Sequence, residues 1–402
     1  GILMHADTVE QFKSKVPIAS YDVMHPWWQR EYNGESDITW PGSPKYFALS
    51  SGTTQGASKF IPVTDAQLKS IFRASRRQLF AAAKSDIPKD FFTKHYLMIG
   101  GSTDLNYDGK KYSGDLSGIS VANLPFWFDH FAVPTEEIKR ERDWHLKVET
   151  MVNEAPNWDV AMIAGAPSWV KMLLEKIIER YELNNIHEIW PHLSVYTWGA
   201  ISITPYKSQI EAMMGHPIHY IESYLCSEGF VAAQTKINAS GMGLVFRNNT
   251  YFEFIPFNEE NFDETGDVKP GAKALDLDEV VEGVNYAILI STCAGAWRYL
   301  IGDIIQFTNV DACEIKITGR TKQYLSLCGE HLSVENMNKA VEEASRELNI
   351  SIPEFTVAGV PFGNFFAHHW YVACNDTLDK EQLKILIDNK INALNDDYAV
   401  ER

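Results

Sequence analysis

The residues of this sequence that are best suited to chemistry follow a short apolar run at positions 46–49. Seven of the nine residues at positions 50–58 are Ser, Thr or Gly, and Lys59 follows them directly. Small residues let backbone N–H groups approach phosphate oxygens closely, hydroxyl groups add donors, and a lysine adds a positive charge. The pattern therefore predicts a buried strand that leads into a phosphate-binding loop. A flexible Ser/Gly linker is the alternative, and the apolar runs on both sides of the loop argue against it.

The spacing of the glycines in this loop separates it from the Walker nucleotide loop. Three residues lie between Gly52 and Gly56, and Lys59 is the third residue after Gly56. The Walker loop has four residues between its glycines and a lysine directly after the second. The segment SSGTTQGASK instead resembles the phosphate-binding signature of the adenylate-forming superfamily, and with KFIP at its end it resembles one branch of it. That branch is the auxin-responsive acyl-acid amido synthetases of plants and their bacterial relatives.

The resemblance implies a nucleotide site built from this loop and from a later turn. Lys59 would be catalytic, because a positive charge at the transferring phosphate stabilises the charge that develops there. The loop residues implied to bind ATP or AMP are Ser50, Ser51, Gly52, Thr53, Thr54 and Gly56. In the segment LSVYTWGAIS, Gly199 and Ala200 stand where a turn borders the adenine ring in the superfamily.

A second signature, Tyr224-Leu225-Cys226-Ser227-Glu228, resembles the superfamily's Tyr-Gly-x-Thr-Glu and the branch's Tyr-x-Ser-Ser-Glu. The resemblance implies that Tyr224 stacks on adenine, that Ser227 binds the α-phosphate, and that Glu228 is catalytic as a ligand of Mg²⁺. Leu225 replaces a small residue, and Cys226 replaces the first serine of the branch. A nucleophilic role for Cys226 is the alternative, but the sequence shows no general base for it.

A third and a fourth signature complete the resemblance. WRYLIGDIIQF resembles a Tyr-x-x-Gly-Asp element, which implies that Asp303 accepts hydrogen bonds from both ribose hydroxyls. Leu300 replaces the second arginine that the branch carries there. In TGRTK, Arg320 is implied to reach the ribose, and Lys322 falls at the pivot between two domains. An ordinary turn aspartate is the alternative for Asp303 taken alone, and the order of all four motifs argues against it.

The elements that position these motifs belong to the α/β class. Strands alternate with helices between about residues 96 and 182, which predicts α/β layering. The resemblance implies a large multi-layer N-terminal domain of adenylate-forming type at residues 1–322 and a smaller, mobile α+β C-terminal domain at residues 323–402. We also expect one helix at residues 135–154. The residues Asn248 and Asn249 tolerate turn conformations, so they predict a β-hairpin that joins residues 243–246 to residues 251–257.

The helix after the loop is the predicted wall of the acyl pocket. Its apolar stripe begins after Thr64 or Asp65, which can cap its first turn. Phe72 and Arg76 are weak candidates for the apolar surface and the carboxylate anchor of that pocket. A solvated basic face that includes Arg76 is the alternative.

The composition of the chain limits which classes of partner it can have. The chain has 402 residues and a net charge of −17, which argues against nucleic acid as the main partner. Its five cysteines show no metal-type spacing and fit a reducing compartment, so we expect a cytoplasmic protein. No apolar run reaches the roughly 20 residues that cross a bilayer, so we expect no membrane partner. The sequence does not indicate an oligomeric state.

The resemblance implies an ATP-dependent ligase with two half-reactions. A carboxylic acid would be activated as acyl-AMP, and the acyl group would then pass to an amino acid or another amine, with ATP and Mg²⁺ required. An acyl-CoA ligase or another acyl-adenylate-forming enzyme is the alternative acceptor chemistry. A non-catalytic nucleotide-binding regulator is a third possibility, and the retained Lys59, Glu228, Asp303 and Arg320 argue against it.

The C-terminal region lacks one feature of the superfamily. Members carry a late catalytic lysine on a glycine-containing loop, whereas Lys380, Lys384 and Lys390 fall on a helical segment with no glycine after Gly363. We therefore expect that the C-terminal domain is incomplete at residue 402. The identities of the acid and of the amine are not encoded in any motif of this sequence.

The pivot assignment gives a first prediction. Proline fixes φ, so Lys322→Pro should trap one orientation of the two domains. We expect one half-reaction to be retained and the other to slow when adenylation and acyl transfer are assayed separately. Equal losses in both half-reactions would show that Lys322 is not the pivot.

Overall fold

The computed structural model describes residues 6–50, 59–82, 87–200, 203–237, 239–263, 265–322, 324–325, 332–350, 352, 354–363, 365–374, 379–395 and 398–399. Its internal contacts divide the chain into two units. The first unit comprises Gly1–Ala48 and Phe60–Lys322, and the second comprises Leu49–Lys59 and Gln323–Arg402. Each unit has a hydrophobic core of its own.

The first unit is built around an 11-stranded sheet. In spatial order its strands are β12 (Thr250–Pro256), β13 (Asn285–Thr292), β14 (Tyr299–Asn309), β15 (Glu314–Arg320), β11 (Met242–Leu244), β10 (Gly229–Ala233), β9 (His219–Cys226), β8 (Val195–Trp198), β7 (Val160–Ala164), β3 (His95–Met98) and β6 (Ala132–Val133). Neighbouring strands are antiparallel from β12 to β9 and parallel from β9 to β6. Strand β9 is therefore the strand at which the sheet changes from antiparallel to parallel.

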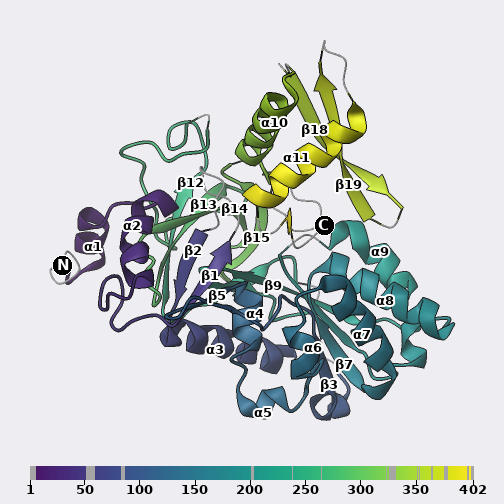
Figure 1. The fold of residues 1–402 in the computed structure, drawn as a ribbon. Coiled ribbons are helices and arrows are strands. Elements are labelled where there is room, and N and C mark those ends of the chain that lie inside the picture. The colour runs from purple at the N-terminus through teal and green to yellow at the C-terminus, as the bar shows by residue number, and fades with distance from the viewer. Residues whose placement is uncertain are drawn as a thin grey trace. The chain divides into compact units, whose positions relative to one another are not determined.

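Helices cover this sheet and connect its parallel strands. The described helices of the first unit are α1 (Val9–Lys15), α2 (Tyr21–Tyr32), α3 (Asp65–Ala82), α4 (Leu116–Val121), α5 (Phe126–Asp129), α6 (Glu136–Arg140), α7 (Trp144–Glu154), α8 (Pro167–Tyr181) and α9 (Thr204–Ala212). In Figure 1, α7 and α8 lie beside the parallel strands. The first four residues of β7 are buried, as expected for a parallel strand covered on both faces. Helix α8 begins with a proline and ends at Glu182, whose φ of 51° is left-handed.

A second sheet in this part of the chain has four strands and frames the predicted phosphate loop. Its order is β2 (Lys59–Val63), β1 (Tyr46–Ser50), β5 (Tyr112–Gly114) and β4 (Asn106–Tyr107). The loop between β1 and β2, residues 51–58, lies outside the described residues. Thr64 caps α3 directly after β2, because its hydroxyl accepts a hydrogen bond from the Gln67 N–H at 3.1 Å.

The second unit has the expected α+β composition. Its described elements are β16 (Tyr324–Leu325), β17 (Leu332–Ser333), α10 (Val334–Leu348), β18 (Glu354–Phe362), β19 (Phe365–Ala373) and α11 (Lys380–Leu394). Strands β18 and β19 form an antiparallel hairpin. Helix α10 buries Met337, Val341 and Ala344, a helical spacing, against Leu383 and Ile387 of α11.

Two local expectations are wrong. Residues 243–246 and 251–257 do not form a hairpin, because β11 pairs with β10 and β15 while β12 pairs with β13. Arg247 and Asn249 have positive φ, as a turn would require, but the chain then continues to β12, an edge strand that is separated from β11 by β13, β14 and β15. The predicted helix at 135–154 is two helices. Helix α6 ends at Arg140, and Asp143 caps the N-terminus of α7.

A buried ion pair ties the N-terminal segment to the sheet. Arg298 donates two parallel hydrogen bonds of 2.9 Å to the carboxylate of Glu253, on neighbouring parts of the sheet. The same guanidinium donates to the backbone oxygens of Lys13 and Val16 at 2.7 and 2.8 Å. The side chain of Glu253 is 1% exposed and that of Arg298 is 8% exposed. Arg298 therefore joins the connection after α1 to the sheet.

This pair gives a prediction about stability. Glu253→Ala leaves the buried Arg298 charge without its counter-charge, so the free energy of unfolding of the first unit should fall by about 3–5 kcal/mol. Urea unfolding measures this loss. The matched control is Lys273→Ala, which removes an exposed ion pair with Glu279 at 2.8 Å and should change stability by less than about 1 kcal/mol. Similar losses in the two variants would contradict the anchoring role.

Candidate active site

The Ser-Glu signature lies at the tip of the hairpin that joins β9 to β10. Cys226 pairs with Gly229, so Ser227 and Glu228 form a two-residue turn. Gly229 has a φ of 143°, and a Cβ at this position would lie 2.3 Å from the Nε2 atom of Gln67. The turn thus needs glycine after the glutamate. Strand β9 continues to Cys226, so the first three residues of the signature belong to this strand.

The side chain of Glu228 is buried beneath this turn. Its residue is 7% exposed, and its carboxylate accepts a hydrogen bond from the hydroxyl of Tyr299. The thiol of Cys226 donates to the backbone oxygen of Gly229 at 3.4 Å. Burial, followed by the negative charge of Glu228, raises the pKa of Tyr299 and the pKa of Cys226 well above their ordinary values. Both groups therefore keep their protons near neutral pH. A protonated Cys226 is unsuited to act as a nucleophile.

Asp303 accepts hydrogen bonds from two other members of the signatures. Arg320 Nε donates to Asp303 Oδ1 at 2.8 Å, and the hydroxyl of Tyr224 donates to Asp303 Oδ2. Asp303 and Arg320 are also cross-strand partners in the register of β14 and β15. Burial, and then the charge of Asp303, raises the pKa of Tyr224 well above its ordinary value, so its hydroxyl remains a donor. The structure therefore brings three predicted site residues into one network.

The shape of the sheet explains how these residues meet. Strands β15, β11 and β10 separate β14 from β9 in the sheet, yet Tyr224 on β9 reaches Asp303 on β14. Side chains on strands this far apart in order can meet only if the antiparallel half of the sheet is strongly curled. Tyr299 on β14 and Glu228 beside β10 make a second contact of the same kind. The curl of the sheet thus brings the second, third and fourth signatures together on its concave side.

The turn predicted beside adenine has the conformation that its sequence suggests. Ala200 has a φ of 68°, in the left-handed region. A Cβ on Gly199 would lie 2.6 Å from the backbone oxygen of Ser223, so only glycine allows the end of β8 to approach β9 this closely. The hydroxyl of Ser223 donates to the Trp198 oxygen at 3.0 Å and fixes this approach. The adenine contact itself remains a prediction.

Other predicted site residues are not joined to this network by any described contact. Ser51, Gly52, Thr53, Thr54 and Gly56 lie outside the described residues. Ser50 ends β1 and Lys59 begins β2, and both belong by their contacts to the second unit. Their proposed roles remain predictions.

The acyl-pocket and pivot residues also remain predictions. Phe72 is half-buried and packs against the main core of the first unit, whereas Arg76 is exposed on α3. Lys322 ends the first unit, and its ammonium lies 2.9 Å from Asp267 Oδ1. Because Lys322→Ala removes this ion pair without restricting φ, it is the matched control for the proline substitution.

Two structural contributors were not predicted. Gln67 of α3 donates from Nε2 to the backbone oxygen of Glu228 and accepts from the thiol of Cys293 at 3.5 Å, so it fixes the hairpin tip from below. Lys147 is buried and donates to the backbone oxygens of Gly100 and Gly101, which fixes the start of the glycine-rich segment after β3. Burial lowers the pKa of Lys147 to about 8. No motif marks either residue, because their partners are backbone atoms distant in sequence.

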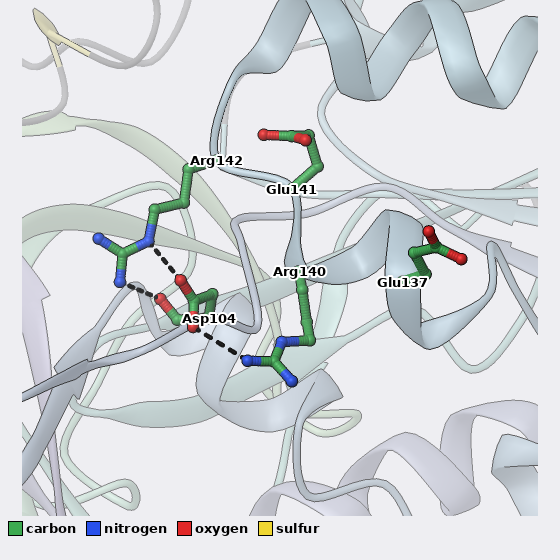
Figure 2. Close-up of a pocket in the computed structure, with 5 residues that line it drawn as sticks. All are labelled: Asp104, Glu137, Arg140, Glu141 and Arg142. Atoms are coloured by element: carbon green, nitrogen blue, oxygen red, sulfur yellow. Dashed lines mark hydrogen bonds and ion pairs between the residues drawn. The ribbon is translucent and has the colours of Figure 1, made fainter.

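An open, charged hollow of about 340 Å³ lies elsewhere on the first unit. It is lined by Asp104, Glu137, Arg140, Glu141 and Arg142. Figure 2 shows that Arg142 and Arg140 both contact Asp104, at 2.8 and 3.5 Å, while the two glutamates stand apart. No predicted site residue lines it. Its arginines are already paired, so it offers no free cationic anchor.

The described residues place two limits on the chemistry. Among them, no three or more His, Cys, Asp or Glu side chains are grouped to hold a metal ion. Within the same part of the chain, no helix has the length and apolar character needed to cross a membrane.

Comparison with known families gives two matches. A model described as the GH3 family N-terminal domain matches residues 3–104 and 77–218. A model described as the GH3 family central domain matches residues 243–320. Together these matches cover more than half of the chain.

Curated relatives include amido synthetases of plants. The chain is 22% identical over 417 residues to the jasmonoyl–L-amino acid synthetase JAR6 of Nicotiana attenuata, covering 86% of this chain and 70% of that protein. It is 31% identical over 175 residues to the indole-3-acetic acid-amido synthetase GH3.4 of Arabidopsis thaliana, covering 40% and 28%.

Solved structures share the fold. The GH3.15 acyl acid amido synthetase matches with a TM-score of 0.65 at 17% identity, over 97% of this chain and 77% of that one. A 2-hydroxyisobutyryl-CoA ligase also matches with a TM-score of 0.65, at 15% identity over 96% and 76%. The expected fold, a large domain of adenylate-forming type with a smaller α+β domain, is confirmed.

The Asp303 network gives a prediction for nucleotide binding. Asp303→Ala removes a charged acceptor from the implied ribose site, so ATP binding should weaken by about 1.5–3 kcal/mol in calorimetry. Asp303→Asn, which keeps an acceptor for Tyr224 but loses the charge, separates nucleotide binding from folding. Asp311→Ala, an exposed turn aspartate after β14, is the control and should bind ATP normally. Unchanged ATP affinity in both Asp303 variants would rule out the ribose assignment.

Proposed function

This chain belongs to the GH3 family, and on that premise we propose that it is an ATP-dependent acyl-acid amido synthetase. The family suggested by the sequence motifs is thereby confirmed. The curated relatives are amino acid conjugating synthetases by name, which supports a ligase that activates a carboxylic acid as acyl-AMP and transfers it to an amine. The observation that carries the proposal at the site is the network in which Asp303 joins Tyr224 to Arg320.

This network is suited to hold the nucleoside part of ATP. Two fixed donors orient the Asp303 carboxylate, so its remaining lone pairs can accept from two ribose hydroxyls. Arg320 is about one-third exposed, which leaves part of its guanidinium available to the ribose. Gly199 and Ala200 would border the adenine, and Tyr224 would contribute its ring face.

Glu228 is the proposed protein ligand of Mg²⁺. Mg²⁺ usually takes one or two carboxylates plus substrate phosphates, which fits a single buried carboxylate whose donor, Tyr299, is neutral. When bound, the ion would neutralise part of the charge on the phosphates. Tyr299 would keep the carboxylate in one orientation.

The remaining roles follow from the chemistry of adenylation. The acid carboxylate attacks the α-phosphorus, the bond from that phosphorus to the β-phosphate oxygen breaks, and pyrophosphate leaves. Ser227, Lys59 and the loop residues would stabilise the charge on the transferring phosphate. An amine then attacks the acyl carbonyl and AMP leaves. We propose that Lys322 lets the second unit serve both half-reactions, and that Phe72 and Arg76 contribute to the acyl pocket.

An acyl-CoA ligase is the second candidate, and one specific observation favours it. The 2-hydroxyisobutyryl-CoA ligase has the same TM-score to this chain as the amido synthetase GH3.15. The fold alone therefore does not separate the two acceptors. Family membership supports the amine.

The setting we propose is the cytoplasm. Among the described residues, Cys226, Cys293 and Cys313 form no disulfide, which supports a reducing compartment. The partners we propose are a small carboxylic acid and an amino acid.

A two-step assay tests the function. ATP–pyrophosphate exchange across a panel of carboxylic acids should rise above the acid-free rate for at least one acid. That acid should then give an amide by mass spectrometry with a mixture of amino acids and give no thioester with coenzyme A. The control is Glu228→Gln, which should lower exchange at least about a hundredfold, a loss of about 2.7 kcal/mol in transition-state stabilisation. Thioester formation without amide formation would favour the second candidate instead.

A further inference from the structure

Four side chains on β8 and β9 share one face of the sheet and are not used by the nucleotide network. Tyr196 is the cross-strand partner of Tyr220, and Trp198 is the partner of Glu222. Residues two apart on a strand lie on the same face, so all four side chains are neighbours. The ring centre of Tyr220 lies 6.0 Å from that of Tyr196 and 6.4 Å from that of Trp198.

Two hydrogen-bond donors in this group are buried without a partner. The Nε1 atom of Trp198 and the hydroxyl of Tyr220 are both inaccessible, and neither has a hydrogen-bond partner among the described residues. Trp198 as a whole is 8% exposed. In contrast, the neighbouring hydroxyl of Tyr196 donates to the Gly165 oxygen at 3.1 Å. Buried donors without partners are destabilising, so each needs an explanation, such as a ligand that completes the site.

An unmatched acceptor lies beside these donors. The backbone N–H and oxygen of Glu222 are bonded to the side chains of Gln234 and Gln78. No described residue forms a hydrogen bond or an ion pair with the carboxylate of Glu222. Burial raises the pKa of Glu222. Lys207 lies 5.4 Å over the ring of Tyr220 and 3.8 Å from Glu211.

These groups together specify the chemistry of a ligand. The indole N–H can only donate, and burial raises the pKa of Tyr220 to about 12, which keeps its hydroxyl protonated. A ligand hydroxyl can accept from both donors and donate to Glu222. A ligand carboxylate would be repelled by Glu222, and an ammonium group could not accept from Trp198. The three aromatic rings favour a flat apolar body attached to that hydroxyl.

The position of the group relates it to the acyl substrate. Tyr220, Glu222 and Tyr224 alternate along one face of β9, and Tyr224 binds Asp303 of the proposed nucleotide site. At about 3.3 Å per residue, Glu222 lies roughly 7 Å and Tyr220 roughly 13 Å along the strand from Tyr224. The turn at Gly199, proposed to border adenine, follows Trp198 directly. An acid joined to AMP at this site could extend along the strand to these residues.

We propose that Trp198, Tyr220 and Glu222 recognise a hydroxyl group at the far end of the acyl acid. The preferred substrates are then carboxylic acids with a flat body and a hydroxyl remote from the carboxylate. This inference rests on the proposed function, because it assigns the substrate class of the same site.

Matched pairs of acids test the inference in wild-type protein. ATP–pyrophosphate exchange is measured with 4-hydroxybenzoate and benzoate, 4-hydroxyphenylacetate and phenylacetate, and 3-(4-hydroxyphenyl)propanoate and 3-phenylpropanoate. At least one hydroxylated acid should exceed its partner at least about tenfold in kcat/KM, because a site built to bond a hydroxyl rejects the analogue without one. Tyr220→Phe and Trp198→Phe should each reduce that preference at least about fivefold, chiefly by lowering kcat/KM for the hydroxylated acid.

Tyr196→Phe is the control on the same face. Its hydroxyl has a partner, so this substitution should lower the melting temperature of the free protein without changing the preference. Tyr220→Phe should leave the melting temperature unchanged or raise it, because it removes an unmatched buried donor and keeps the ring.

Two failures are distinguishable. If acids support exchange but every hydroxylated member and its partner react equally, or if Tyr220→Phe lowers the melting temperature as much as Tyr196→Phe, the inference is wrong and the function stands. If no acid in this set or in the wider panel supports exchange, the proposed function fails and the inference fails with it.

Discussion

Asp303 accepts hydrogen bonds from Tyr224 and Arg320, and the arrangement of the site depends on this contact. The three side chains come from three strands, two of which are separated by three others in the sheet. Only a strongly curled sheet brings them together, so the contact is both a consequence of the curl and a constraint on it. The hydrogen bond from Tyr299 to Glu228 is a second contact between β14 and the turn that precedes β10. The acidic groups of the site are thus fixed before any substrate arrives.

Strand β9 connects this curled half to the parallel half of the sheet. One end of the strand carries Tyr224 and leads into the Ser-Glu turn, and the other end carries the aromatic and acidic side chains beside β8. Strand pairing changes from antiparallel to parallel at β9, so this strand belongs to both halves of the sheet. A nucleotide and an acid can therefore be bound by one strand, with Gly199 allowing β8 to approach it closely.

The sequence alone was sufficient for the family, the fold and the order of the signatures. Motifs succeed there because phosphate, ribose and adenine contacts need particular residue types at fixed positions on short segments. Pairing between distant strands was not predictable from local pattern. Arg247 and Asn249, after β11, have the positive φ of a turn, yet the chain continues to the edge strand β12 instead of forming a hairpin. Gln67 and Lys147 were missed for a related reason, because each acts on backbone atoms distant in sequence.

The central claim is that the carboxylate of an acid attacks the α-phosphate of ATP at this site. The most direct measurement uses an acid labelled with ¹⁸O in its carboxylate and follows the label by mass spectrometry during amide formation. The mechanism predicts that AMP is released carrying one ¹⁸O atom, because the bridging oxygen of acyl-AMP comes from the acid and leaves with AMP. Release of unlabelled AMP, or of ADP and phosphate, would contradict the account.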